Sequence, residues 1–143
     1  MMMGQSLAIA VDFDGTIVEH KYPAIGKEMP FAFATLKELQ KRGHRLILWT
    51  YRHGKTLDAA VEYCKQNGVE FYAVNRSFPE EKFDPNEASR KLDCDMFIDD
   101  RNIGGFLGWG EMFRMIHPEE AASQENGPAS QKKKGLFGKL FKG

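Results

Sequence analysis

The sequence has little cysteine, and its two cysteines are far apart. Cys64 and Cys94 lie thirty residues apart in a chain of 143, with no CxxC spacing and no clustered histidines. This arrangement matches neither a zinc-ligand pattern nor the dense disulfide framework of small secreted domains. A chain of this length can bury a hydrophobic core without covalent cross-links. We therefore expect both side chains to be reduced core thiols.

A long hydrophobic run is also missing. The apolar run nearest the N-terminus, 7–11, stops at Asp12, and no basic segment precedes it. A signal peptide needs such a basic segment, and a membrane-spanning helix needs about 20 apolar residues. We therefore expect a cytoplasmic protein.

Net charge is absent too, since 20 basic residues balance 20 acidic ones. A neutral chain has no general attraction to nucleic acid, and we expect no nucleic-acid partner. Residues 118–143 nevertheless hold five lysines and three glutamates, a local excess of +2. Their first half, 118–131, carries few bulky apolar side chains. The composition thus predicts a domain at 1–117 followed by a flexible linker and a basic tail.

The basic tail has an amphipathic pattern. Leu136, Phe137, Leu140 and Phe141 would share one face of a helix, with lysines around them. Such a pattern is typical of segments that contact a membrane surface or a protein partner. The glycines between them and the short length favour the alternative, a solvated tail.

What the chain does have is an alternation of strand and helix patterns. Short continuous apolar runs predict strands buried on both faces, and apolar residues at helical spacing predict helices between them. This order predicts an α/β fold with a mainly parallel sheet joined by right-handed crossovers. The predicted strands are 7–11, 45–49, 69–74 and 96–98, and the predicted helices are about 30–42 and 57–66.

Polar residues follow three of the predicted strands directly. Ligands bind at the carboxyl ends of parallel strands, so we expect functional residues at 12–16, 50–52 and 99–101. The first segment contains Asp12 and Asp14, and the third begins with Asp99 and Asp100. If the first and fourth strands are neighbours, these carboxylates converge. An exposed Asp-Gly turn is the alternative explanation of the first segment.

Converging carboxylates repel one another unless a divalent cation lies among them. Oxygen ligands without histidine or cysteine favour Mg²⁺ over zinc. A free carboxylate beside Mg²⁺ points to phosphoryl transfer, in which the carboxylate attacks phosphorus and forms an aspartyl-phosphate. The remaining phosphoryl oxygens then need hydroxyl or cationic groups. Thr50 and a lysine before the fourth strand can supply these, and Arg52 is placed to meet an anionic substrate. For Arg101, substrate contact and ordinary solvation are both open.

The order of these residues resembles the four motifs of the haloacid dehalogenase superfamily. The resemblance covers residues 7–103 and implies a Rossmann-like three-layer sandwich and a magnesium-dependent phosphatase. The motifs as they stand here are Asp12-Phe13-Asp14-Gly15-Thr16, then Leu46-Ile47-Leu48-Trp49-Thr50, then Lys91, then Phe97-Ile98-Asp99-Asp100.

The resemblance also implies roles. Asp12 is the nucleophile and a metal ligand, and Asp14 is the acid/base residue and gives its backbone carbonyl to the metal. Asp100 is the direct metal ligand of the fourth motif, and Asp99 supports it. Thr50 and Lys91 hold the phosphoryl oxygens.

Other residues have looser assignments. Lys82 is the rival of Lys91, and Gly15 and Thr16 are expected to bind substrate with Arg52.

The spacing leaves no room for the cap domain that members of this superfamily usually carry. Asp14 and Thr50 are 36 residues apart, and Thr50 and Lys91 are 41 apart. Only a short flap at about 16–29 fits. An open site favours a macromolecular substrate or closure by a second subunit of a homo-oligomer, although small phosphorylated molecules stay open. A non-catalytic phosphate-binding module and a phosphotransferase are the alternative functions.

Overall fold

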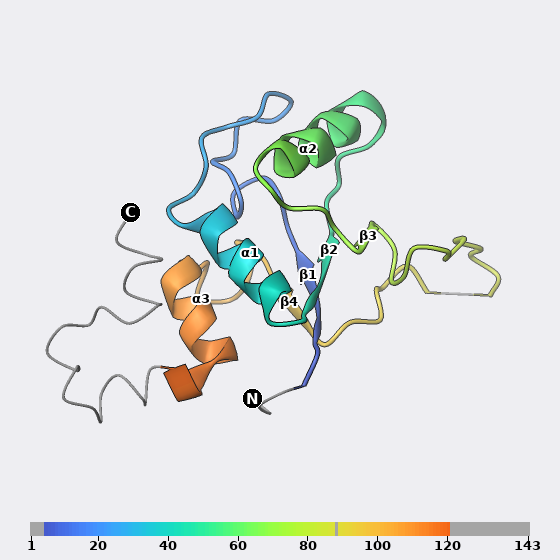
Figure 1. The fold of residues 1–143 in the computed structure, drawn as a ribbon. Helices are drawn as coiled ribbons and strands as arrows, with labels where there is room; N and C mark the ends of the chain where they lie inside the picture. The colour runs from blue at the N-terminus through green and yellow to red at the C-terminus, as the bar shows by residue number, and fades with distance from the viewer. Residues whose placement is uncertain (1–4, 88, 121–143) are drawn as a thin grey trace, which may run out of the picture.

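The computed structural model describes residues 5–87 and 89–120, and Figure 1 shows their arrangement. Strands and helices alternate along this part of the chain, as expected for an α/β protein. Their bounds are β1 (Ala8–Val11), α1 (Ala32–Lys41), β2 (Arg45–Leu48), α2 (Gly54–Gln66), β3 (Ala73–Val74), β4 (Met96–Ile98) and α3 (Trp109–Ile116).

The four strands form a single parallel sheet in the order β3-β2-β1-β4. Val11 at the end of β1 is level with Leu48 of β2 and with Ile98 of β4. The polar segments that follow these strands therefore meet at one edge of the sheet. The α/β class with a parallel sheet is confirmed.

One face of the sheet is covered by all three helices. Alternate residues of a strand point to the same face, and this face presents Ile9, Val11, Leu46 and Leu48, all fully buried. They form the main core with the apolar sides of α1, α2 and α3. Figure 1 shows α1 and α3 side by side on this face.

The opposite face differs from the expected sandwich. Three of its four buried strand residues are alanines, Ala8, Ala10 and Ala73, and the fourth is Ile47. Leu92 from the irregular segment 75–95 packs on them. That segment crosses from β3 to β4, contains two prolines and has no helical pattern. In the described residues, helices thus form one outer layer only, and irregular chain forms the other.

Strand β3 is also shorter than the predicted strand at 69–74. Its ladder bonds run only from Tyr72 N–H, which donates to the Leu46 carbonyl, to Asn75 N–H, which donates to the Leu48 carbonyl. Val69 is fully buried in the main core instead. The apolar run at 69–74 therefore has two parts, core residues that precede the strand and strand β3 itself.

Helix α3 begins at Trp109 despite the surrounding glycines, because two of its aromatic side chains are anchored. Trp109 and Phe113 are almost fully buried in the main core.

Cys64 is buried, Cys94 is partly buried, and both are free thiols, as expected. No helix in the described part of the chain is long and apolar enough to cross a membrane.

An ion pair and a hydrogen bond connect the chain after α3 to the residues that follow α1. Arg42 pairs with Glu120 at 2.5 Å, and the His44 and His117 Nε2 atoms are 3.0 Å apart. Leu7 N–H donates to His44 Nδ1 at 3.1 Å, so the neutral His44 ring carries its hydrogen on Nε2 and donates it to His117. The predicted linker thus begins with ion-paired residues, and the basic tail lies outside the described residues.

Candidate active site

Three carboxylates converge where β1 and β4 end. Asp12 N–H donates to the Ile98 carbonyl at 3.0 Å, which extends the ladder between the two strands. Each of Asp12, Asp99 and Asp100 offers an oxygen, and these oxygens all lie within 4.8 Å of one another. The predicted convergence of the two aspartate pairs is therefore real for three of the four residues.

The crowding changes the acidity of Asp12. Burial raises the pKa of Asp12 from 3.8 to about 7, with further contributions from the charge of Asp99 and from Asp100. The Thr16 hydroxyl donates to Asp12 Oδ2 at 3.2 Å, and this hydrogen bond lowers the pKa of Asp12. Without a cation, the cluster therefore holds a proton near neutral pH.

Asp100 has an oxygen that the protein leaves unsatisfied. Its Oδ1 atom is buried and accepts no hydrogen bond within the described structure. A buried polar atom without a partner is costly, and a bound cation would satisfy it. All donors here are oxygens, so the residues fit Mg²⁺.

Gly15 makes room for that carboxylate. Its φ is +87°, a conformation that glycine adopts without strain, and a Cβ at this position would lie 2.3 Å from Asp100 Oδ2. We expected Gly15 to bind substrate, but the structure places Asp100 against its α-carbon. The glycine leaves the space that the Asp100 carboxylate occupies.

Asp14 lies apart from the other three and pairs with Arg52. The Arg52 Nε and Nη2 atoms donate to the two Asp14 oxygens, each at 2.7 Å. Both side chains are almost completely buried. This bidentate pair fixes the Asp14 carboxylate at the wall of the site.

The expected contact of Arg52 with substrate is therefore wrong. Arg52 is 1% exposed, and its remaining donors bind the carbonyls of Pro23, Ala24 and Thr56. Its guanidinium also lies 5.0 Å from the centre of the Phe13 ring. Arg52 ties the flap to the sheet and holds Asp14, and it has no donor left for an anion.

Thr50 and Thr16 have different surroundings. Thr50 N–H donates to Asn75 Oδ1 at 2.8 Å, and its hydroxyl oxygen accepts the Arg52 N–H at 3.1 Å. Because the Thr50 oxygen accepts this bond with a lone pair, its hydroxyl hydrogen is left to donate to a ligand.

Thr16 is fully buried, so its expected substrate contact is wrong. It supports Asp12, and its carbonyl accepts Trp109 Nε1–H at 2.9 Å.

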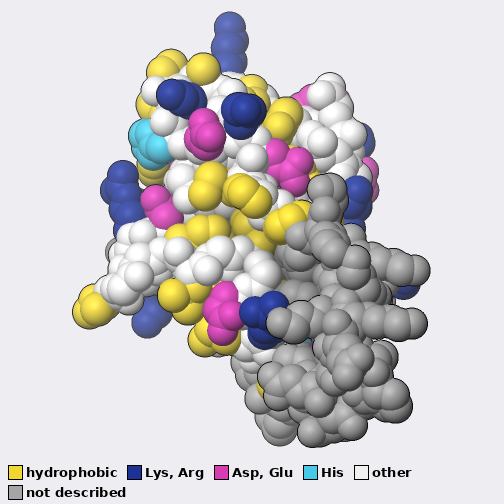
Figure 2. All heavy atoms as spheres, turned by 90° about the vertical axis from the view of Figure 1, so that its left-hand side faces the viewer, with side chains coloured by type: hydrophobic (Ala, Val, Ile, Leu, Met, Phe, Trp, Pro, Cys, Tyr) yellow, Lys and Arg dark blue, Asp and Glu magenta, His cyan; other side chains and the backbone are white. Residues whose placement is uncertain are grey.

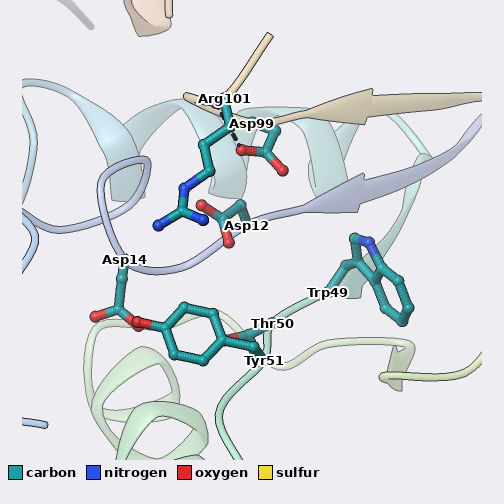
Figure 3. A pocket seen from close by; sticks show the side chains of 7 residues that line it. All are labelled: Asp12, Asp14, Trp49, Thr50, Tyr51, Asp99 and Arg101. Carbon is teal, nitrogen blue, oxygen red and sulfur yellow. Dashed lines mark hydrogen bonds between the residues drawn. The ribbon is translucent and has the colours of Figure 1, made fainter. Parts of the chain in front are cut away.

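These groups surround an open hollow of about 310 Å³ (Figure 3). Asp12 and Asp99 lie on one side of it, and Thr50 and Tyr51 lie on the other. Arg101 extends from the chain after β4, and in this view its side chain points toward Asp12. The full lining is Asp12, Asp14, Trp49, Thr50, Tyr51, Asp99 and Arg101.

Lys91 does not line this hollow. It is exposed and lies in an adjoining hollow of about 380 Å³, which shares Trp49, Thr50 and Tyr51 with the first. Lys82 lines neither of the two. The structure therefore brings Lys91 nearer to Thr50 than its rival, but not beside Asp12.

Asn75 is a site residue that the sequence did not single out. It follows β3 directly, as Asp12 follows β1, and its φ of +53° turns the chain so that its side chain reaches Thr50. The rule that polar residues after strands are functional would have found it. The predicted strand at 69–74 ends at the same residue as β3, so this signal was present in the sequence.

No protein-family model and no curated protein matches the chain. A solved structure does match it, that of a conserved protein from Bacteroides thetaiotaomicron. The two sequences are 52% identical, and the match covers 86% of this chain and 99% of that one with a TM-score of 0.75.

Proposed function

The chain belongs to the same family as the conserved Bacteroides thetaiotaomicron protein, and we propose that it is a magnesium-dependent phosphomonoester hydrolase. One observation carries this proposal: Asp12, at the wall of an open hollow, shares a three-carboxylate cluster with Asp100, whose buried oxygen has no partner. The resemblance of the four motifs to the haloacid dehalogenase superfamily gives independent support.

The cluster supports a proposed metal site. Asp12, Asp99 and Asp100 would hold Mg²⁺, together with the backbone carbonyl of Asp14. Bound there, Mg²⁺ would offset the negative charge of the phosphoryl oxygens and of the carboxylates themselves.

In the first step, an Asp12 oxygen attacks phosphorus, and the bond from phosphorus to the leaving-group oxygen breaks. The product is an aspartyl-phosphate on Asp12, and the leaving oxygen takes a proton from the Asp14 carboxyl. The Thr50 hydroxyl donates to one phosphoryl oxygen. Asp12 and Thr50 line the same hollow, so both can contact a phosphoryl group bound there.

In the second step, water attacks the phosphorus, Asp14 takes a proton from that water, and the bond from phosphorus to Asp12 breaks. Arg52 donates to both Asp14 oxygens, each at 2.7 Å. The Asp14 carboxyl must therefore turn away from Arg52 to present an oxygen to the leaving group or to the attacking water.

The direct test is phosphate release from 4-nitrophenyl phosphate with Mg²⁺ or with EDTA. We expect Mg²⁺-dependent release by the wild type and its loss in Asp12→Asn. Asp58→Asn, which removes an exposed carboxylate on α2, should keep the activity. If the wild type releases no phosphate from any substrate of a broad phosphomonoester panel, this result would contradict the proposal and favour a phosphate-binding module. Transfer of phosphate to an added alcohol in place of release would identify a phosphotransferase.

The described part of one face gathers no positive charge. Figure 2 shows basic and acidic side chains interspersed there, with hydrophobic side chains among them. Duplex-binding proteins instead gather lysine and arginine on the surface that meets the nucleic acid. The proposed substrate is a phosphomonoester that enters the open hollow.

A further inference from the structure

We propose that Arg101, rather than Lys91, is the cation that binds the transferred phosphoryl group. This assignment rests on the proposed phosphatase function. It replaces the lysine expected from the motif resemblance with a residue whose role the sequence left open.

The position of Arg101 is fixed by the turn after β4. Its backbone N–H donates to Asp99 Oδ1 at 2.9 Å, and Asn102 Nδ2 donates to the Asp99 carbonyl at 2.7 Å. The turn therefore links the metal cluster directly to the arginine. In Figure 3 the side chain extends from this turn and points toward Asp12.

The charge of the hollow gives the second argument. Three carboxylates line it, and Arg101 is the one positively charged residue among its seven lining residues. Arg52 is fully engaged beneath the flap, whereas Arg101 is exposed and forms no ion pair within the described residues. A phosphoryl group at Asp12 thus meets an available guanidinium.

The chemistry of guanidinium suits this role. Its planar donors can bind two phosphate oxygens at once, which fixes the phosphoryl group as well as neutralising it. With the Thr50 hydroxyl on the opposite wall, the group would be held from two sides while Asp12 attacks. Arg101 is therefore a catalytic residue in this proposal, because it touches the reacting group.

The test compares three variants on phenyl phosphate with Mg²⁺. Arg101→Gln should lower kcat/KM by about 100-fold, the scale of removing a donor that stabilises developing charge. Arg101→Lys should recover part of that loss, and Arg114→Gln, an exposed arginine of α3, should retain full activity. Calorimetry with inorganic phosphate should show weaker binding to Arg101→Gln while Mg²⁺ binding persists.

Two results would overturn the assignment. Either Arg101→Gln retains wild-type kcat/KM, or Lys91→Ala loses more activity than Arg101→Gln. An inactive wild type would instead overturn the phosphatase function itself, so the two failures are distinguishable.

The adjoining hollow carries a second inference of its own. We infer that it binds the leaving group of the substrate, and that this group contains a ring and a second negative charge. The hollow shares Trp49 and Tyr51 with the first one, and its own lining adds Phe83, Arg90 and Lys91. It also contains Glu81, whose carboxylate accepts the Ser77 N–H at 2.8 Å. Arg90 lies 4.8 Å from the centre of the Phe83 ring, so an aromatic surface and positive charge occur together.

A matched pair of substrates tests this inference. 4-Carboxyphenyl phosphate carries the second charge that phenyl phosphate lacks, and the ratio of their kcat/KM values cancels effects on the transferred group. Lys91→Ala should lower this ratio by about fivefold, the upper range for an exposed ion pair. Lys82→Ala, outside the hollow, and Arg101→Gln should leave the ratio unchanged. An unchanged ratio in Lys91→Ala would refute the inference, even in a fully active enzyme.

Discussion

At the scale of single residues, the site depends on neighbours that do no chemistry. Asp100 can lie beside Asp12 only because residue 15 has no side chain, and Asp14 is held because Arg52 is buried beside it. Neither dependence follows from residue type. The sequence shows which groups are charged, but not which partner each side chain reaches. This is why Arg52 was expected to meet substrate and why Arg101 stayed open.

Gly15→Ala should damage the metal site more than the fold. The new Cβ would meet Asp100 Oδ2 at 2.3 Å, and a positive φ costs a non-glycine residue about 1–2 kcal/mol. Gly43→Ala is the matched control, because Gly43 has a φ of +91° and nothing within 4 Å of its added Cβ. We expect similar strain in both variants by chemical denaturation, but weaker Mg²⁺ binding by calorimetry in Gly15→Ala alone. Equal Mg²⁺ affinity in the two would contradict this account.

Arg52→Met should destabilise the protein by about 3–5 kcal/mol, the usual result of leaving one buried charge without its partner. The free energy of unfolding in urea measures this loss. Adding Asp14→Asn to Arg52→Met should restore part of the stability, since it removes the orphaned charge. If the double variant is less stable than Arg52→Met, the buried pair is not the source of the effect.

At the scale of elements, the strand-end rule explains how much of the site was predictable. The runs before Asp12 and Asp99 are continuous and apolar, and parallel pairing of β1 with β4 brings their carboxyl ends together. Strand β3 was harder to predict, because Val69 is apolar for core packing rather than for the ladder. The absence of helices on the second face of the sheet was not predictable from periodicity either. The alanines of β1 let either a helix or irregular chain pack closely on this face.

The pairing of β1 with β4 makes stability depend on metal and pH. The folded pKa of Asp12 lies at about 7, above its ordinary value of 3.8, so ionising it opposes folding. Metal-free protein should therefore lose stability as pH rises from about 4 to about 7. Mg²⁺ removes this penalty, so it should raise Tm more at about pH 8 than at about pH 5.

Asp12→Asn provides the decisive comparison for this prediction. It should raise the Tm of metal-free protein at alkaline pH and abolish most of the response to Mg²⁺. Asp58→Asn should behave like wild type in thermal unfolding. A Mg²⁺ response that is equal at both pH values would contradict the prediction.

At the scale of the whole molecule, a histidine pair joins the turn between α1 and β2 to the residue that follows α3. Burial, followed by the charges of His117 and Arg42, lowers the pKa of His44 below 6.5. Its neutral form is therefore favoured by folding, and this stability is present above pH 6.5 and lost as pH falls further. In an Asp12→Asn background, Tm should fall between about pH 7.5 and about pH 5.5. His44→Asn should flatten that fall, and an equally steep fall would assign it to other groups.

The order of the strands has a consequence for folding kinetics. Ile9 pairs with Met96, 87 residues later, whereas its partner on β2, Leu46, is only 37 residues later. Contacts so distant in sequence form slowly, because a long loop must close before any of them stabilises the chain. Before β4 docks, the chain has brought only Asp12 to the sheet edge, and two of the three cluster carboxylates are elsewhere. Mg²⁺ binding therefore reports that this long loop has closed, which helix formation measured by circular dichroism does not.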